Sequence, residues 1–443
     1  MLVDIGPSIT GSDGIKRTHK RLRIKKIKTL FGTIEIKRIA YSLPGVPSLF
    51  PLDAILNLPI LDVSYNLQKN FVLEIIKSSF DESIKSIERW TGIKISKDQA
   101  KKIIIESAND FKKFYDFQSS KGKSEAKKLP LIILTSDGKG VVMRKEDLRE
   151  ATKKRAEKKK LTKSEDIFNT DKFNSKRIAT VASVYEIARH YRMPINIIQD
   201  FFLKTNSKRK TKRPRPKAKR VWASLEDSSE EVINEIFKEA LERDPLNIKE
   251  WVVLVDGDPN QIKIFKKLSR KFGVKLTIIC DIIHVLEYVW KAGKVLNCDD
   301  SNDKLETWVS IKFTQILNGK SSFVASGIRR SATCRNLDKK TRKPVDICAK
   351  YLLNHSAYLK YNEYLKKGYP IATGIIEGAC RYLVKDRMEI TGARWGLKGA
   401  EAVLKLRAIK ISDDFQKYWK FHEQQQYIRN HKILYQDPAV IEK

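Results

Sequence analysis

Residues 251–280 read WVVLVDGDPNQIKIFKKLSRKFGVKLTIIC, and this stretch decides the fold class. The apolar run Trp251–Val255 is bounded by turn residues, as is typical of a buried strand, and VKLTIIC (274–280) predicts a second strand. Between them, NQIKIFKKLSRKFG has the apolar spacing of an amphipathic helix. A strand, a helix and a strand in succession indicate a partly parallel α/β sheet.

The same alternation continues on both sides of this stretch. The apolar run Leu129–Leu134 predicts a buried strand that ends shortly before Asp137, and RIATVASVYEI (177–187) predicts a further strand. SSEEVINEIFKEALERD (228–244) is predicted to be an amphipathic helix. Residues 286–370 lose the strand pattern and are expected to be mainly helical. The sequence therefore predicts an α/β fold, with a mixed sheet flanked by helices and interrupted by a mainly α-helical insertion.

The N-terminal part has a different pattern. RTHKRLRIKKIKTLFGTIEIKRIAY (17–41) alternates basic and apolar residues around an FGT turn, which predicts a strongly basic β-hairpin. Such a hairpin could contact DNA, or its lysines could simply keep an exposed sheet edge from aggregating. Two helices are predicted within 79–115, divided at Gly92, and Ser96 with Gln99 forms a capping box for the second. They could form a helix-turn-helix, although such pairs are common in any α-helical domain.

Charge is the outlier in the composition. The 443 residues include 88 Lys and Arg against 53 Asp and Glu, a net charge of +35. A surplus of this size would repel itself unless a polyanion is the usual partner, and nucleic acid is the first candidate. An anionic membrane is the second, but there is no signal peptide and no long uncharged apolar run. We therefore expect no membrane association.

One segment concentrates the positive charge. Residues 204–220 read KTNSKRKTKRPRPKAKR, with ten basic residues in 17 and no acidic one. Two prolines deny the segment a regular helix. It is expected to be a mobile loop that orders on a phosphate backbone, while a targeting signal or a solvated loop would have the same composition. The residues expected to contact DNA here are Lys208, Arg209, Lys210, Lys212 and Arg213.

The number and spacing of the cysteines argue against a disulfide-linked domain and against a zinc ribbon. There are five, an odd number, and no pair has CxxC spacing. This pattern supports neither a disulfide framework nor a zinc ribbon, and it favours an intracellular location.

Three carboxylates suggest a chemistry. Asp137 and Asp256 each follow a predicted strand, and in open α/β sheets this edge is where sites form. Glu377 begins a predicted helix in YPIATGIIEGACRYLVKDRMEITGARWG (369–396) and could pack beside them. Grouped carboxylates repel unless a cation lies between them, and hard oxygen ligands suit Mg²⁺ or Mn²⁺. Two such ions can cleave a phosphodiester.

Each acid also has an ordinary explanation. Glu377 could favour the positive N-terminal end of its helix and pair with Arg381 four residues on. SDG and VDGD are common turn sequences, so Asp137 and Asp256 could be turn residues. Spacing alone does not decide between these interpretations.

Several blocks resemble a known family. SDGKGVVMR, WVVLVDGDPNQ, CDIIH and GIIEGACRYLVKDRMEITGARWGLKGAEAVLKLRA resemble the core of bacterial insertion-sequence transposases of the ISKra type, and LFPLDAILNLP with SFDESI…TGIKIS resembles their N-terminal half. The similarity runs from about Thr29 to Trp419. These are DDE transposases with an RNase H-like fold and two-metal chemistry. The lysine-rich stretches 153–164 and 204–220 lie outside the matching blocks.

The resemblance assigns roles to the acids. Asp137 becomes the first acid, Asp256 the second and Glu377 the third, as ligands of Mg²⁺ or Mn²⁺. The related Mutator-type group has a Cys- or Asp-x-x-His signature after its second acid, which Asp281 and His284 fit. Asp281 and Asp258 compete for the second position. Asp256 is favoured because it ends the better strand and leaves DIIH downstream.

The implied function is DNA transposition. The enzyme would bind the terminal inverted repeats of its element, hydrolyse a phosphodiester and join the freed 3′-OH to target DNA. Arg381 and Lys385 would hold phosphates near Glu377. Joining two ends implies a homodimer or larger synaptic complex, and the bacterial cytoplasm, near the nucleoid, is the expected location. The alternative is a non-catalytic or domesticated DNA-binding derivative.

The expected organisation has five parts. They are an N-terminal DNA-binding region (1–120), the first part of the catalytic core (126–285), the helical insertion (286–370), the last part of the core (371–412) and a C-terminal tail (413–443).

Overall fold

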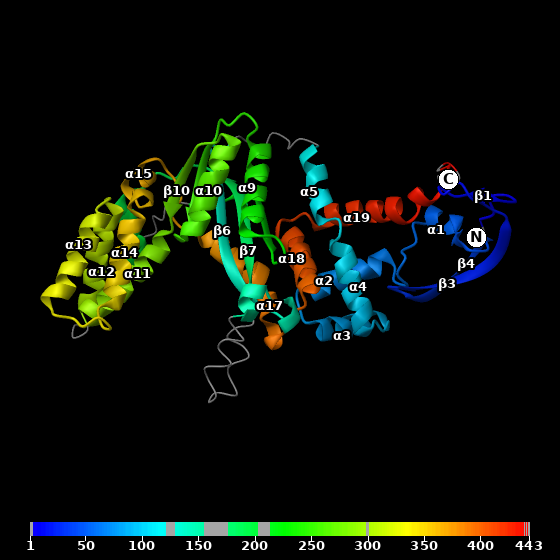
Figure 1. Ribbon diagram of the computed structural model, residues 1–443, viewed down its shortest axis with the longest axis horizontal. Helices are drawn as coiled ribbons and strands as arrows, with labels where there is room; N and C mark the ends of the chain where they lie inside the picture. Colours follow the sequence, from blue (N-terminus) through cyan, green and yellow to red (C-terminus); the bar gives the residue numbers. More distant parts are fainter. Residues whose placement is uncertain are drawn as a thin grey trace. The chain divides into compact units, whose positions relative to one another are not determined.

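The computed structural model describes residues 3–120, 129–154, 176–202, 213–297, 301–437, 439 and 441, and these residues form a mixed α/β protein (Figure 1). They divide into two compact units. The first comprises residues 1–121, 140–177 and 383–443, and the second comprises residues 122–139 and 178–382.

The second unit contains most of a mixed five-stranded sheet with the order β10-β9-β6-β7-β8. Strands β10, β9 and β6 are parallel neighbours, whereas β7 and β8 are antiparallel. The predicted mixed sheet is thus confirmed. The strands are β6 (Leu131–Val142), β7 (Lys176–Ile187), β8 (Lys217–Ser224), β9 (Glu250–Val255) and β10 (Leu276–Cys280).

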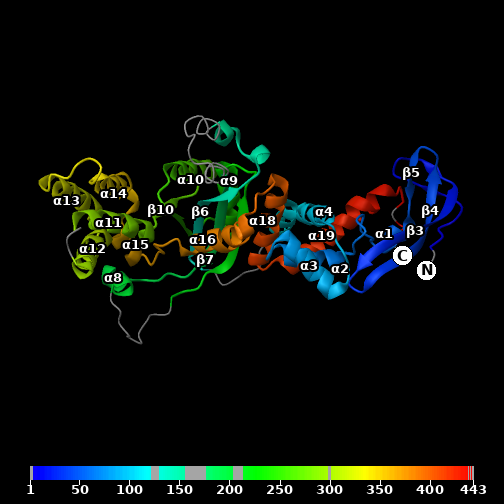
Figure 2. The same cartoon turned by 90° about the horizontal axis from the view of Figure 1, so that it is seen from below.

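Two helices flank this sheet and lie side by side in both views (Figures 1 and 2). The helices are α9 (Ser229–Arg243), as predicted, and α10 (Pro259–Phe272). The Phe237 ring of α9 stacks on the Phe272 ring of α10, with ring centroids 5.5 Å apart. Phe237 also lies 6.1 Å from Trp251 of β9, so one aromatic side chain joins both helices to the sheet.

A group of helices follows β10, which confirms that 286–370 is mainly helical. The helices after β10 are α11 (Ile282–Leu296), α12 (Asn302–Leu317), α13 (Ser321–Cys334), α14 (Lys343–Asn354) and α15 (Tyr361–Lys366). Their buried faces carry the expected aliphatic and aromatic residues, such as Val309 and Phe313 of α12 and Leu352 of α14. Phe201, from the earlier helix α8 (Pro194–Phe202), packs edge-on against Phe313.

The first unit begins with the predicted basic hairpin. Strands β3 (His19–Thr29) and β4 (Gly32–Leu43) are paired antiparallel along their whole length, from His19 opposite Ser42 to Thr29 opposite Gly32. A third strand, β5 (Val46–Leu49), pairs with β4. Short strands β1 (Ile9–Thr10) and β2 (Lys16–Arg17) form a separate pair.

The rest of this unit is helical, and its helix ends follow local sequence rules. Gly92 ends one helix in the left-handed conformation, with φ of 68°. Ser96 and Gln99 exchange capping hydrogen bonds of 3.2 and 3.3 Å, as predicted. The helices are α1 (Pro51–Ile55), α2 (Tyr65–Ile75), α3 (Phe80–Thr91), α4 (Lys97–Ala108), α5 (Phe111–Ser120), α17 (Asp386–Met388), α18 (Leu397–Ile411) and α19 (Phe415–Asn430).

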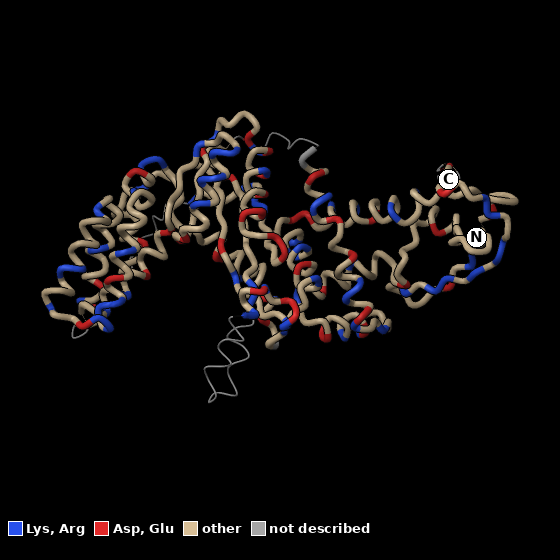
Figure 3. The backbone as a smooth tube through the Cα atoms, viewed as in Figure 1, with Lys and Arg blue, Asp and Glu red and all other residues tan. Residues whose placement is uncertain are grey.

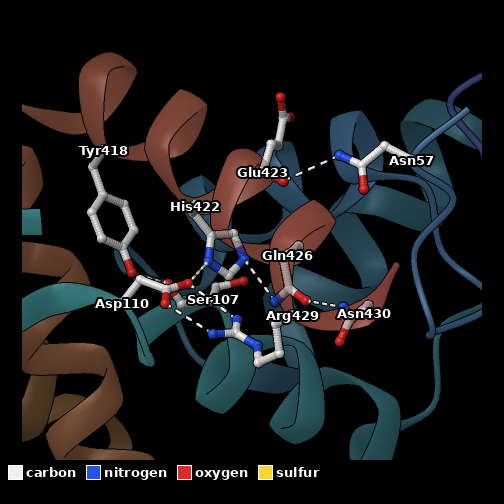
Figure 4. Close-up of polar contacts among 9 residues, drawn as sticks. All are labelled: Asn57, Ser107, Asp110, Tyr418, His422, Glu423, Gln426, Arg429 and Asn430. Carbon is white, nitrogen blue, oxygen red and sulfur yellow. Dashed lines mark hydrogen bonds and ion pairs between the residues drawn. The ribbon is translucent and has the colours of Figure 1, made fainter. Parts of the chain in front are cut away.

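Helix α19 lies within the segment expected to be a C-terminal tail, and it is packed rather than free. Its His422 is fully buried, and the ring Nδ1 lies 2.7 Å from Asp110 (Figure 4). Arg429 donates two hydrogen bonds to the same carboxylate, at 3.0 and 3.2 Å. Burial raises the pKa of Asp110, but the hydrogen bonds from His422 and Arg429 outweigh burial and hold this pKa below its usual 3.8. Asp110, directly after α4, therefore holds α19 in place through hydrogen bonds to His422 and Arg429.

None of the helices in the described residues combines the length and the apolar character needed to cross a bilayer.

Candidate functional site

Three aspartates occupy corresponding positions in or directly after three neighbouring parallel strands. Thr135 of β6 pairs with Leu254 of β9, so two residues further on Asp137 stands opposite Asp256. Val255 pairs with Cys280 of β10, so the next position sets Asp256 opposite Asp281. Because parallel neighbours advance together along a sheet, the three acids form a row across β6, β9 and β10.

Asp137 lies inside its strand, not beyond it. The sequence predicted a strand ending near Leu134, but β6 continues to Val142. That prediction was wrong because the apolar run stops at Leu134 while the backbone pairing continues. Asp137 is consequently held by strand geometry rather than by a turn.

The carboxylate of Asp137 has two donors and one acidic neighbour. The Cys380 thiol donates to Oδ2 at 3.2 Å, and the backbone N–H of Gly138 donates to Oδ1 at 2.6 Å. The pKa of Asp137 is raised, mainly by burial and further by the charge of Asp256. The hydrogen bonds from Cys380 and Gly138 and the charge of His284 lower this pKa in part. Asp137 and Asp256 are therefore close enough to repel each other.

Asp256 lies in a tightly held loop. The Tyr351 hydroxyl donates to the backbone carbonyl of Asp256 at 2.8 Å, and His355 Nε2 lies 2.9 Å from the carbonyl of Gly257. Gly257 has φ of +100°, and a Cβ there would come within 2.7 Å of the Tyr351 hydroxyl. Asp258, two residues on, accepts from the N–H of Asn260 at 2.8 Å and caps α10. Asp258 is thus used as a helix cap.

Asp281 is fully buried, and Thr373 links it to Glu377. The Thr373 hydroxyl lies 2.8 Å from Asp281 and 3.0 Å from Glu377 Oε1, and its single proton can serve only one of them. Thr373 N–H also donates to Asp281, as does the N–H of Ile283 in α11. Burial raises the pKa of Asp281 to about 6, and the charge of Glu377 acts in the same direction.

Glu377 is exposed on the short helix α16 (Gly374–Ala379). Cys380, one turn later, donates its thiol hydrogen bond to Asp137. Burial together with the charges of Asp137 and Glu377 raises the pKa of this thiol. Through Cys380 and Thr373, Glu377 is positioned near both ends of the row.

The helix after Glu377 is not regular. Residues 380–385 form a π-helical turn, η3 (Cys380–Lys385), where continued α-helical spacing was expected. Its i→i+5 bonding adds one residue to the turn, and such turns are frequent at functional sites. Arg381 is exposed and belongs to the second unit with Glu377, whereas Lys385 is exposed and belongs to the first unit.

The acids have the donor chemistry for a hard divalent cation but do not form a closed ligand set. Within the described residues, no three His, Cys, Asp or Glu side chains are grouped so that they could hold a metal ion. Asp137 and Asp256 are nevertheless adjacent and mutually repulsive, and carboxylate oxygens are what Mg²⁺ or Mn²⁺ prefers. A cation held between them would relieve this repulsion.

The remaining predicted site residues have different outcomes. His284 is half-buried in the first turn of α11, with its ring 6.2 Å from that of Tyr288. Arg213 forms an ion pair of 2.5 Å with Asp200. Lys208, Arg209, Lys210 and Lys212 lie outside the described residues.

The basic segment 204–220 is not a loop throughout. Its last four residues, 217–220, begin strand β8, which lies at one edge of the sheet. Edge strands commonly carry lysines, so a basic sequence with little apolar character was mistaken for a loop.

No protein-family model matches the chain, and no curated protein was found to be similar to it.

Sequence reasoning missed several residues that shape the site. Cys380 and Thr373 lie within four residues of Glu377, so helical spacing from that acid could have indicated them. Tyr351 and His355 contact the Asp256 loop from 95 and 98 residues away. Nothing in the local pattern of α14 predicts that contact.

Proposed function

We propose that this chain is a DDE-type transposase of a bacterial insertion sequence. The observation that carries the proposal is the register that sets Asp137 opposite Asp256 on neighbouring parallel strands. Glu377 lies near the same row through Cys380 and Thr373. In this proposal, three acids separated by more than a hundred residues each would form one site.

The sheet supports an RNase H-like core. Strand β6, the first of the five in the chain, is central; β9 and β10 run parallel to it on one side, and β7 with β8 extends the sheet on the other. An RNase H-like core has this order. The helices between β10 and α16 would then be an insertion ahead of the third acid.

Each part of the site has a task in this mechanism. Asp137, Asp256 and Glu377 would hold Mg²⁺ or Mn²⁺, which when bound activates water and stabilises the leaving oxygen in phosphodiester cleavage. Cys380 orients the Asp137 carboxylate through its thiol. Asp281 and Thr373 fix the start of α16 and so limit where Glu377 can reach. Arg381, one residue after Cys380, would contact a phosphate.

DNA binding is supported by the distribution of charge in the first unit. Strand β3 carries six Lys and Arg residues and no acid, and most of its side chains are exposed. Figure 3 marks the Lys and Arg positions of this strand in blue. A two-stranded ribbon of this kind can lie in a groove of duplex DNA. We assign the hairpin to binding of the terminal repeats, in a homodimer or larger complex that joins two ends.

A second candidate is a DNA-binding protein without catalytic activity. The observation that favours it is the lack of a closed metal-ligand group among the described residues. Both candidates need the same basic surfaces and differ only in whether the acids perform chemistry.

The deciding experiment is cleavage of labelled DNA that carries the ends of the element, with Mg²⁺ and with EDTA. A transposase nicks at the ends in Mg²⁺ only, and Asp137→Asn loses this activity while retaining binding. Binding without nicking in any divalent cation would favour the non-catalytic alternative.

A further inference from the structure

A row of cations lies along one face of α10 in the second unit. Lys263, Lys266, Lys267 and Arg270 are exposed and recur at intervals of three or four residues, so they share one side of the helix. The opposite side, with Phe265 and Leu268, is buried. The row covers eight residues of helix, and seven steps of 1.5 Å make it about 10 Å long.

This row lines a groove. The groove has a volume of about 680 Å³, and His355 and Tyr358 form its other wall. A second groove of about 490 Å³ shares Lys266, Arg270 and Tyr358 with the first. It adds the cations Lys360 and Lys367 and one acid, Glu363. The two grooves thus share two cations, and each is lined by several Lys or Arg side chains.

Few of these cations are neutralised within the protein. Lys267 pairs with Glu230 at 2.6 Å, and Lys360 lies 3.9 Å from Glu363. Lys266 lies over the Tyr358 ring, 5.2 Å from its centroid. In the described part of the chain, neither Lys263 nor Arg270 forms an ion pair with a carboxylate. Positive charges held this close together favour an anion between them.

The groove adjoins the loop that carries Asp256. Asp258 caps the first turn of α10, and His355, on the opposite wall, contacts the carbonyl of Gly257. The Tyr351 ring is tilted against that of His355, with ring centroids 4.4 Å apart, and the Tyr351 hydroxyl donates to the carbonyl of Asp256. One end of the groove and the second acid are therefore parts of the same packed structure.

We propose that this groove binds the phosphodiester backbone of DNA beside the scissile bond, with Lys263, Lys266 and Arg270 contacting successive phosphates. The inference rests on the proposed function, in which the row of acids would cleave the DNA that this groove binds. A row of about 10 Å matches roughly three base-pair steps, longer than a single phosphate group. The ligand is therefore a polymer rather than a free phosphate.

The test is DNA binding by the full chain with Lys263→Ala and Arg270→Ala combined. Affinity for a labelled duplex is measured by fluorescence anisotropy across a salt series. Losing two phosphate contacts should reduce the slope of log affinity against log salt by about 1.8. We expect at least a tenfold loss of affinity near physiological salt.

Two matched variants serve as controls. Lys271→Ala with Lys275→Ala removes the same charge from exposed positions outside the groove and should keep the slope of the parent. Lys263→Arg with Arg270→Lys keeps both cations and should also keep it. If the groove variant and the alanine control bind alike, the proposal is wrong.

Further arms separate this inference from the proposed function. Repeating the titration with single-stranded DNA shows whether the groove binds single-stranded or duplex DNA. A loss of affinity by the groove variant for either kind of DNA supports the proposal. If the acid variants cleave like the parent while the groove variant loses affinity, the groove is a DNA site and the transposase mechanism fails. If the acid variants lose cleavage and the groove variant binds normally, the mechanism stands and the groove proposal fails.

Discussion

Asp256 and Asp281 hold neighbouring positions in the row of acids, but their surroundings give them different uses. The N–H groups of Ile283 and Thr373 donate to one oxygen of Asp281, the Thr373 hydroxyl lies 2.8 Å from the other, and the side chain is fully buried. Asp256 is half-buried, and its Oδ1 accepts a hydrogen bond of 3.1 Å from the N–H of Asp258. Asp281 therefore holds the segment before Glu377 in place, and Asp256 is less enclosed than Asp281.

The first prediction at this scale separates chemistry from binding. Asp137→Asn, Asp256→Asn and Glu377→Gln each keep the size of the side chain and remove one charge from the row. Cleavage and strand transfer should fall by several orders of magnitude because a divalent cation needs that charge. DNA binding should survive, since it depends on basic side chains elsewhere. Paired binding and cleavage gels with and without Mg²⁺ measure both.

Asp258→Asn is the matched control for these variants. It removes one charge two residues from Asp256, but Asn caps a helix as well as Asp does, so cleavage should remain close to the parent. Arg381→Ala should show a smaller loss of rate together with some loss of affinity, as for a phosphate contact. Acid variants that cut like the parent would show that the mechanism is wrong at these residues, and acid variants that fail to fold would show a structural role.

The second prediction concerns Asp110. Asp110→Asn leaves buried His422 and the guanidinium of Arg429 without their anion, and should reduce the free energy of unfolding by about 3 kcal/mol. The pKa of Asp110 lies below 3.8 in the folded protein, so its stabilisation is complete above that pH and is lost as pH falls through the folded pKa. Urea unfolding at several pH values should show the two proteins converging in acid.

Asp116→Asn is the control for this prediction. Asp116 is exposed on α5, the helix that begins directly after Asp110. The substitution should therefore change the free energy of unfolding by less than about 0.5 kcal/mol. A gap between parent and Asp110→Asn that stays constant well below pH 3.8 would contradict the assignment, as would a stable Asp110→Asn protein at neutral pH.

At the scale of elements, the hairpin β3–β4 offers a clean comparison between paired and unpaired cations. Arg21 and Arg23 are exposed on β3, and the described residues supply no carboxylate to either. Lys20 and Lys26, on the same strand, pair with Asp4 and Glu35 at 2.7 and 2.9 Å. A cation that already has an acidic partner contributes less to phosphate binding.

The third prediction follows from that difference. Arg21→Ala with Arg23→Ala should lower duplex affinity and reduce the salt slope by about 1.8, as for two phosphate contacts. Lys20→Ala with Lys26→Ala removes the same charge and should have a smaller effect. Equal losses from the two pairs would indicate a general charge effect, and no loss from either would mean that the hairpin does not contact DNA.

Local rules explain which elements the sequence predicts well. The basic hairpin, the capping box of Ser96 and Gln99 and the helix after Ser228 depend on neighbours within a few residues, and all are present. Trp90 shows the limit of such reasoning. It follows Ile87 by three residues in α3, a spacing that puts both on one side of the helix, yet Ile87 is buried and Trp90 is 82% exposed. Periodicity marks a face without telling whether a partner covers it.

Contacts from distant segments could not be predicted in this way. The acids were identified from strand ends and family resemblance, but the register that aligns Asp137 with Asp256 depends on pairing across more than a hundred residues. The contact of Cys380 with Asp137 and that of His355 with Gly257 are likewise tertiary. Local sequence carries no signal for such contacts because packing creates them.

At the scale of the whole molecule, the net charge of +35 should limit stability in the absence of DNA. Like charges destabilise a compact state, and salt screens them over about 10 Å at 0.1 M. We predict that the melting temperature rises by a few degrees between low and moderate salt. Adding duplex DNA at low salt should raise it further, by the linkage between binding and folding, about 2.7 kcal/mol at a hundred times Kd.

This fourth prediction also distinguishes screening from specific binding. Salt weakens DNA affinity while it relieves self-repulsion, so the stabilisation by DNA should shrink as salt increases, and the two melting curves should approach each other. Asp137→Asn should behave as the parent does, because the binding surfaces are elsewhere. A melting temperature that falls steadily with salt would mean that internal ion pairs, such as Arg429 with Asp110, outweigh the surplus of positive charge. In that case the surplus is already dispersed over the surface, and a polyanion is not needed to stabilise the fold.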